Sequence, residues 1–146
     1  MDQGRVAVAN MFGTQDLDKV PEVFPYGIYT IPEVSCVGLS EQEAEKKGIN
    51  YQVGRANYED LPRGKIMGIK DGMLKILFDP ETLQILGVHV VGKIASEVVH
   101  YGVTLVENKK TLKDVISTIF NFPTLHDLYK YASYDGLGAI KGHKVK

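Results

Sequence analysis

Four stretches of the chain are predicted to form β-strands, and in the first of them apolar and polar residues alternate, as in half-buried strands. These stretches cover residues 27–39, 49–58, 73–78 and 83–92. The first contains Pro32 and predicts one or two edge strands, where a missing backbone donor is tolerated. The last two flank Asp79-Pro80-Glu81-Thr82, whose residue types favour a tight turn and predict an antiparallel hairpin. Residues 59–72 show no period and are predicted to be irregular.

Helical signals occupy most of the remaining chain. We predict helices over residues 1–12, 40–47, 94–107, 111–120 and from 124 onward. Three of them open on a Ser or Thr followed three residues later by Glu or Asp, the signature of a capping box. These pairs are Ser40–Glu43, Thr111–Asp114 and Thr124–Asp127. Gly13 and Gly48 are predicted to end the first two helices.

The order of elements predicts an α+β fold, a mainly antiparallel sheet with helices on one side. Residues 14–26 contain two prolines and little periodicity, which is typical of a linker. Helices 94–107 and 111–120 carry more apolar positions than one sheet face requires, and the sheet has a face left to cover. We therefore predict a two-fold homodimer.

Length and charge exclude several functional classes. The chain has 146 residues, enough for one domain with a substantial core, and 44% of them are hydrophobic. A formal net charge of −1 argues against a nucleic-acid partner, which usually requires a basic surface. No apolar run reaches membrane-spanning length and no signal-peptide pattern is present, so we expect no membrane partner and a soluble, cytoplasmic chain. Lys141, His143, Lys144 and Lys146 are expected to form a solvated tail.

The residues alone form no catalytic or metal-binding set. Cys36 is the single cysteine, and on an apolar strand it is expected to behave as a small buried hydrophobe. The histidines, His89, His100, His126 and His143, match no metal-ligand spacing, so no metal site is predicted. Glu97 and His100 lie three apart on one helix and could pair. Residues 87–97 hold a glycine-containing turn from strand to helix, but not the GxGxxG pattern of a phosphate site.

Three segments resemble, in order and spacing, the C-terminal dimerisation domain of the pyridine nucleotide-disulfide oxidoreductases. They are residues 27–48, 72–100 and 120–137. The resemblance implies a longer flavoprotein with FAD as cofactor, NAD(H) and NADP(H) as substrates, and a homodimer. Residues 1–12 resemble the helix that ends the FAD-binding part of such proteins. We therefore expect residues 1–25 to be a remnant of that part plus a linker, and 26–146 to be the dimerisation domain, inactive in isolation and without its own cofactor.

The third segment departs from the family where thiol chemistry takes place. Members that reduce disulfides carry His-Pro-Thr followed by a Glu; the His exchanges protons with the redox thiols of the opposite subunit, and the Glu orients its ring. The resemblance puts Phe122 in the His slot and Asp127 in the Glu slot. Phenylalanine has no proton to exchange, so no catalytic residue is expected, and His126 would point elsewhere. The resemblance also implies a cis Phe122–Pro123 bond and contact of both residues with the FAD of the opposite subunit.

Loss of the base favours the transhydrogenase branch of the family, which passes hydride between NADPH and NAD through FAD without a thiol step. That branch resembles this chain in an aromatic residue before Pro123 and in a similar Asp135-Gly136-Leu137 ending. Two alternatives stay open. One is a relative of lipoamide dehydrogenase that has lost or moved its acid/base residue, which an upstream CxxxxC would favour. The other is a freestanding, non-enzymatic assembly module.

Overall fold

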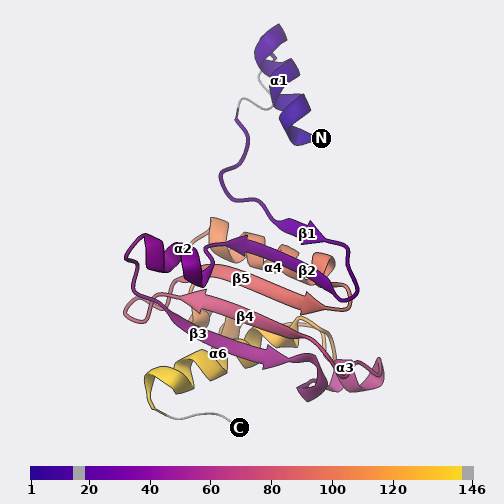
Figure 1. The fold of residues 1–146 in the computed structure, drawn as a ribbon, viewed down its shortest axis with the longest axis vertical. Helices are drawn as coiled ribbons and strands as arrows, with labels where there is room; N and C mark the ends of the chain where they lie inside the picture. Colours follow the sequence, from indigo (N-terminus) through magenta and orange to yellow (C-terminus); the bar gives the residue numbers. More distant parts are fainter. Residues whose placement is uncertain (15–18, 143–146) are drawn as a thin grey trace.

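A computed structural model describes residues 1–14 and 19–142 of the chain (Figure 1). Its centre is a five-stranded antiparallel sheet with the strand order β1-β2-β5-β4-β3. The strands are β1 (Tyr26–Ile28), β2 (Glu33–Gly38), β3 (Gln52–Asn57), β4 (Met73–Phe78) and β5 (Ile85–Gly92). Each stretch predicted to be extended therefore contains a strand, and the first resolves into two, joined through a cis Ile31–Pro32 bond. Of the predicted tail, His143, Lys144 and Lys146 lie outside the described residues.

Helices α4 (Ala95–Glu107) and α6 (Asp127–Ile140) cover one face of the sheet. The other helices are α1 (Asp2–Phe12), α2 (Glu41–Lys46), α3 (Pro62–Ile66) and α5 (Leu112–Ser117), with a 3₁₀ turn η1 (Tyr58–Asp60). α4 packs on β2 and β5, and α6 packs on β3 and β4, both behind the sheet in Figure 1. α2 lies on the opposite face, where Lys75 Nζ donates to Glu41 Oε1 at 2.6 Å. The predicted α+β class is confirmed.

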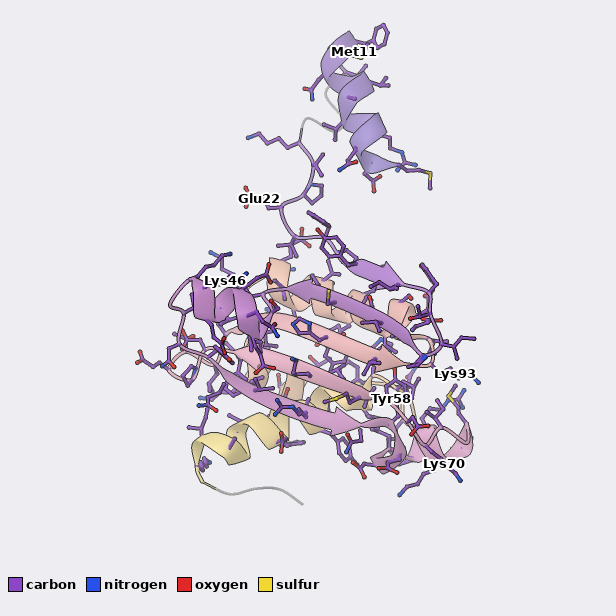
Figure 2. The ribbon with its side chains drawn as sticks, in the orientation of Figure 1. Met11, Glu22, Lys46, Tyr58, Lys70 and Lys93 are labelled. Carbon is purple, nitrogen blue, oxygen red and sulfur yellow. The ribbon has the colours of Figure 1, made fainter. Side chains whose placement is uncertain are left out.

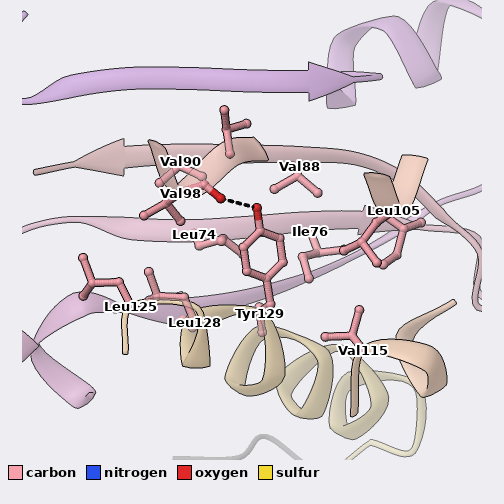
Figure 3. Close-up of a cluster of buried hydrophobic side chains, with 14 of the residues drawn as sticks. Leu74, Ile76, Val88, Val90, Val98, Leu105, Val115, Leu125, Leu128 and Tyr129 are labelled. Carbon is pink, nitrogen blue, oxygen red and sulfur yellow. Dashed lines mark hydrogen bonds between the residues drawn. The ribbon is translucent and has the colours of Figure 1, made fainter. Parts of the chain in front are cut away.

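The core lies between the sheet and the α4–α6 layer (Figure 3). Alternate residues of the central strands point toward the helices and are at most 2% exposed; these are Leu74, Ile76, Val88 and Val90. Helix residues that meet them are buried to the same degree: Val98, Leu105, Leu128 and Tyr129. Fully burying one such side chain stabilises the fold by roughly 1.5–3 kcal/mol. The alternation of side chains along β4 and β5 therefore sets which residues meet the helices.

The sequence prediction missed one helix and placed the end of another too late. The stretch over 59–72, predicted to be irregular, contains the end of η1 and all of α3, with Pro62 as the first helical residue, where its missing N–H breaks no helical hydrogen bond. Gly64 lets α3 pack on the backbone of Tyr58, because a Cβ at this position would overlap the Tyr58 carbonyl oxygen. Glycine weakens the helical signal in this segment. α5 ends at Ser117 rather than near Phe120.

The first two predicted capping boxes form. Ser40 Oγ accepts from the Glu43 N–H at 3.2 Å, while Glu43 Oε2 accepts from the Ser40 N–H at 2.8 Å. Thr111 and Asp114 make the same pair of bonds at 3.3 and 2.7 Å. The hydrogen bonds from Ser40 lower the pKa of Glu43. These ends of α2 and α5 are therefore specified by residues within one helical turn.

Helix α1 lies outside the two layers (Figure 1). It ends at Gly13, whose φ of 67° is the left-handed conformation predicted for a helix stop. Val8, Met11 and Phe12 are exposed, whereas Val6 and Ala9 are buried. In the described part of the chain, no helix has the length and apolarity needed to cross a bilayer.

Candidate functional site

The candidate site is the link between α5 and α6, residues 118–126. Its Phe122–Pro123 peptide bond is cis, as the resemblance implies. Phe122 is 72% exposed and Ile119 is 94% exposed, so neither side chain belongs to the core of this chain. The link therefore presents apolar groups outward from the corner between two helices.

Asp127 holds the backbone of the link. Its side chain is buried, and Oδ2 accepts a hydrogen bond from the Thr124 N–H at 3.2 Å. The other half of the predicted capping box does not form, since the buried Thr124 Oγ1 has no hydrogen-bond partner among the described residues. The prediction that the last helix opens at Thr124 is wrong: α6 begins at Asp127, with His126 as its N-cap.

A tight turn before α6 explains this difference. The backbone N–H groups of Asp127, Leu128 and Tyr129 each donate to a carbonyl three residues earlier, as in a 3₁₀ turn. The Asp127 N–H is thereby directed at the Thr124 carbonyl, at 3.4 Å, rather than at the Thr124 hydroxyl. The turn leaves Thr124 Oγ1 without the donor that a capping box would supply.

His126 packs within a cluster of aromatic rings. Its ring stacks on Tyr129 with 6.2 Å between centroids, and it lies 6.0 Å from Phe120 and 6.4 Å from Tyr101. Tyr101 meets Phe120 and Tyr129 edge to face, at 5.2 and 5.0 Å. The cluster joins α4, the link and α6, so His126 fixes the corner by packing. The sequence did not predict this role, because Tyr101 lies on another helix.

Tyr129 ties α6 to the middle of α4. Its buried hydroxyl accepts from the Gly102 N–H at 3.0 Å and donates to the Val98 carbonyl at 2.8 Å (Figure 3). The hydroxyl thus inserts between two groups that pair with each other in a regular helix. Burial raises the pKa of Tyr129 well above its usual range. A Cβ on Gly102 would lie 3.1 Å from this hydroxyl and 3.0 Å from Val88 Cβ, so glycine makes room for the contact.

The start of α4 is held from two sides. Glu33 Oε2 accepts from the Ser96 N–H at 3.1 Å and from Ser96 Oγ at 2.8 Å, so a carboxylate from β2 already occupies this helix N-terminus. The Tyr58 hydroxyl donates to the Lys93 carbonyl at 3.2 Å; both residues are labelled in Figure 2. Burial raises the pKa of Tyr58 to about 12. This turn therefore positions α4, and the Glu33 carboxylate fills the place that a bound anion would take at the helix N-terminus.

A surface pocket of about 400 Å³ lies between α3, the start of α4 and the link. Much of its wall is apolar, with Met67, Ile94, Val98 and Pro123 among the residues that line it. Thr124, whose hydroxyl lacks a partner in the described structure, lines the same pocket. Arg63, Glu97 and His126 also line the pocket, so it can take an apolar group that carries a polar atom.

The other candidates from the sequence lie away from the link. Cys36 and His89 face each other on β2 and β5. Burial raises the pKa of the Cys36 thiol, which disfavours the thiolate, and burial lowers the pKa of His89. His100 is exposed on α4, and Glu97 lines the pocket. Within residues 1–14 and 19–142, no three His, Cys, Asp or Glu side chains are placed to hold a metal ion.

Comparison with protein families gives a match over residues 24–133, to the dimerisation domain of the pyridine nucleotide-disulphide oxidoreductases. Among curated proteins, the chain is 44% identical over 142 residues to the soluble pyridine nucleotide transhydrogenase of Marinomonas sp. (strain MWYL1), covering 95% of this chain and 30% of that protein. The soluble pyridine nucleotide transhydrogenase of Yersinia pestis (strain Pestoides F) is 43% identical, again over 95% of this chain and 30% of that protein. The chain thus spans less than a third of the length of these relatives.

Two solved structures share the fold of this chain. The HOCl-induced flavoprotein disulfide reductase RclA from Escherichia coli superposes with a TM-score of 0.79 at 21% identity, over 91% of this chain and 31% of RclA. LpdA from Mycobacterium tuberculosis gives a TM-score of 0.78 at 22% identity, over 90% of this chain and 29% of LpdA. At these identities the likeness concerns the fold.

Proposed function

Because the chain belongs to the dimerisation-domain family of the pyridine nucleotide-disulphide oxidoreductases, we propose that it is the C-terminal domain of a soluble FAD-dependent transhydrogenase. The longer protein would pass hydride between NADPH and NAD, and the isolated chain would not. The observation that carries the proposal is Phe122, which the family resemblance puts where disulfide-reducing members hold their acid/base His. Similarity to the soluble transhydrogenases supports the same assignment.

Neither polar neighbour of Phe122 replaces the missing base. Asp127 is buried and accepts from the Thr124 N–H, so its carboxylate is committed to the backbone of the link. His126 is packed among aromatic rings. Thiol–disulfide chemistry needs a group that takes and returns the thiol proton, whereas hydride transfer between nicotinamides does not. The residues of the link therefore favour the transhydrogenase over a disulfide reductase.

The link also fits contact with a flavin ring. FAD, when bound, would accept hydride from one nicotinamide nucleotide and give it to the other. Phe122 and Pro123 offer an apolar surface that keeps water from such a ring. We assign this contact to the FAD of the opposite subunit in a homodimer. In that arrangement Phe122 orients and shields the cofactor and moves no proton.

A homodimer would cover the apolar surface around the link. Ile119 and Phe122 are strongly exposed, Ile94 in the wall of the pocket is 38% exposed, and Ile66 at the end of α3 is 66% exposed. Exposed apolar groups of this size are usually buried against a partner, and a second copy gives a closed two-fold contact. Sedimentation of the longer protein should give dimers at tens of micromolar; a strict monomer would contradict the assignment.

Hydride transfer in the longer protein tests the function. The purified flavoprotein should reduce a spectrally distinct NAD analogue with NADPH. Phe122→Asp should lower the rate by about tenfold, a change of about 1.4 kcal/mol in the barrier, because it brings charge and water to the ring. Phe122→Tyr keeps the aromatic surface and should stay within about twofold. NADH oxidation that depends on a disulfide substrate, with no transfer between nucleotides, would instead support the reductase.

A further inference from the structure

We propose that the β1–β2 hairpin docks this domain onto the part of the same polypeptide that precedes residue 1 in the longer protein. The inference rests on the proposed function, because it requires that longer protein. Large apolar side chains are exposed on the hairpin and its approach: Phe24, Tyr26, Ile28, Tyr29, Ile31 and Val34. We call these residues the hairpin surface.

The hairpin surface is ordered although it is uncovered. Ser35 Oγ donates to the Tyr26 carbonyl at 2.6 Å, and Glu33 fastens β2 to the start of α4. Gly27 faces Ser96 of α4, so strand alternation directs Tyr26 and Ile28 to the sheet face that α4 and α6 leave open. An ordered and exposed apolar patch marks contact with another surface.

The chemistry of the hairpin surface fits a permanent contact between domains. No charged residue lies between Glu22 and Glu33, although 24% of the whole chain is charged. Aromatic, uncharged surface is typical of the centre of an interface rather than of its rim. Pro25 lacks a backbone N–H and β1 has only three residues, so an added strand would find few partners along this edge. The contact would therefore be made by side chains.

The preceding part of the polypeptide is the favoured occupant because its connection leads directly into β1 (Figure 1). The curated relatives are matched over only 30% of their length, which leaves a large preceding part to be placed. Residues 13–25 span at most about 45 Å even when fully extended, and α1 adds about 17 Å, so that part remains tethered near the hairpin. A tethered surface acts at an effective concentration on the order of millimolar, which favours it over a free partner.

Limited trypsin cleavage after Lys19 tests the docking. In the longer protein, Tyr26→Asp should speed this cleavage at least tenfold, because a charge on the open face of the hairpin surface releases the domain and frees the connection. Ile28→Asp provides a second variant with the same expected result. Ile140→Asp places the same charge on an exposed side chain at the end of α6 and should leave cleavage unchanged. In the isolated chain all variants should be cleaved at one rate and unfold at the same urea concentration.

The outcomes separate the possible occupants. Unchanged cleavage in both hairpin variants, with the dimer intact, would overturn the proposal. If cleavage is unchanged but the hairpin variants are monomers, the proposal is also overturned. That result would show that a second copy of the chain covers the hairpin surface. Because cleavage needs neither nucleotide nor hydride transfer, the docking can hold even if the transhydrogenase assignment fails.

Discussion

Helices α5 and α6 each follow a threonine with an aspartate three residues later, yet the two corners differ. At Thr111–Asp114 both bonds of the capping box form, at 2.7 and 3.3 Å. At Thr124–Asp127 only the bond from the Thr124 N–H to Asp127 forms, at 3.2 Å, and the Thr124 hydroxyl has no partner within the described structure. The first corner is an ordinary helix start, and the second lies next to the exposed Phe122.

The two corners are held by different forces. The first uses hydrogen bonds within one turn, whereas the second relies on rings from three elements and on the Tyr129 hydroxyl in α4. The position of the second corner is therefore set by α4, on which it packs. The capping box, a local sequence signal, therefore forms only in part at the candidate site. Departures from local signals are expected at functional sites.

The largest expected effect is at Tyr129. Tyr129→Leu removes a buried ring and the hydroxyl that joins α6 to α4, and should lower the free energy of unfolding by about 3 kcal/mol. Tyr134→Leu changes a half-exposed tyrosine on the same helix and should cost less than about 0.5 kcal/mol. Urea unfolding of the isolated chain measures both. Equal losses would show that the second corner does not depend on packing.

A matched pair of substitutions compares the corners directly. Thr111→Val removes a complete cap and should cost about 1 kcal/mol. Thr124→Val removes a buried hydroxyl that bonds to nothing in the described chain, so its effect should be near zero or slightly stabilising. Both are read from urea midpoints. A loss at Thr124 as large as that at Thr111 would mean that the two corners use their threonines alike.

The smallest effect is a pH dependence at the first corner. Hydrogen bonds from Thr111 lower the pKa of Asp114 in the folded chain below its unfolded value of about 3.9. The stabilisation is therefore complete above about pH 4 and is lost as pH falls through the folded pKa. Asp114→Asn should be less stable than wild type by a few tenths of a kcal/mol at pH 6, and the difference should shrink near pH 3. A difference that stays constant in thermal melts across this range would rule out a titrating cap.

Local signals in the sequence were sufficient for much of the fold. Asp79 Oδ1 accepts from the N–H groups of Glu81 and Thr82 at 2.7 and 3.1 Å, which is the turn chemistry that the residue types predict. The contact of Glu33 with Ser96 could not be predicted in this way, because its partners lie on separate elements. α3 was missed for a related reason, since Gly64 reads as a breaker until Tyr58 is seen packed against it.

Some features of the candidate site were predicted from the sequence, and others depend on contacts between separate elements. The place of Phe122 and Pro123 came from family resemblance, and the cis bond between them agrees with it. Contact of these residues with FAD stays a prediction. The aromatic packing of His126 and the unpartnered Thr124 hydroxyl carry no sequence signal, because both depend on how α4 and α6 are spaced.

The Gly102 amide donates to a hydroxyl on another helix, and this has a consequence for hydrogen exchange. An amide in mid-helix is normally released to solvent when its own helix unwinds. This one also requires α6 to move away from α4, because its acceptor belongs to Tyr129. Its exchange with deuterium therefore reports the separation of the two helices that flank the link.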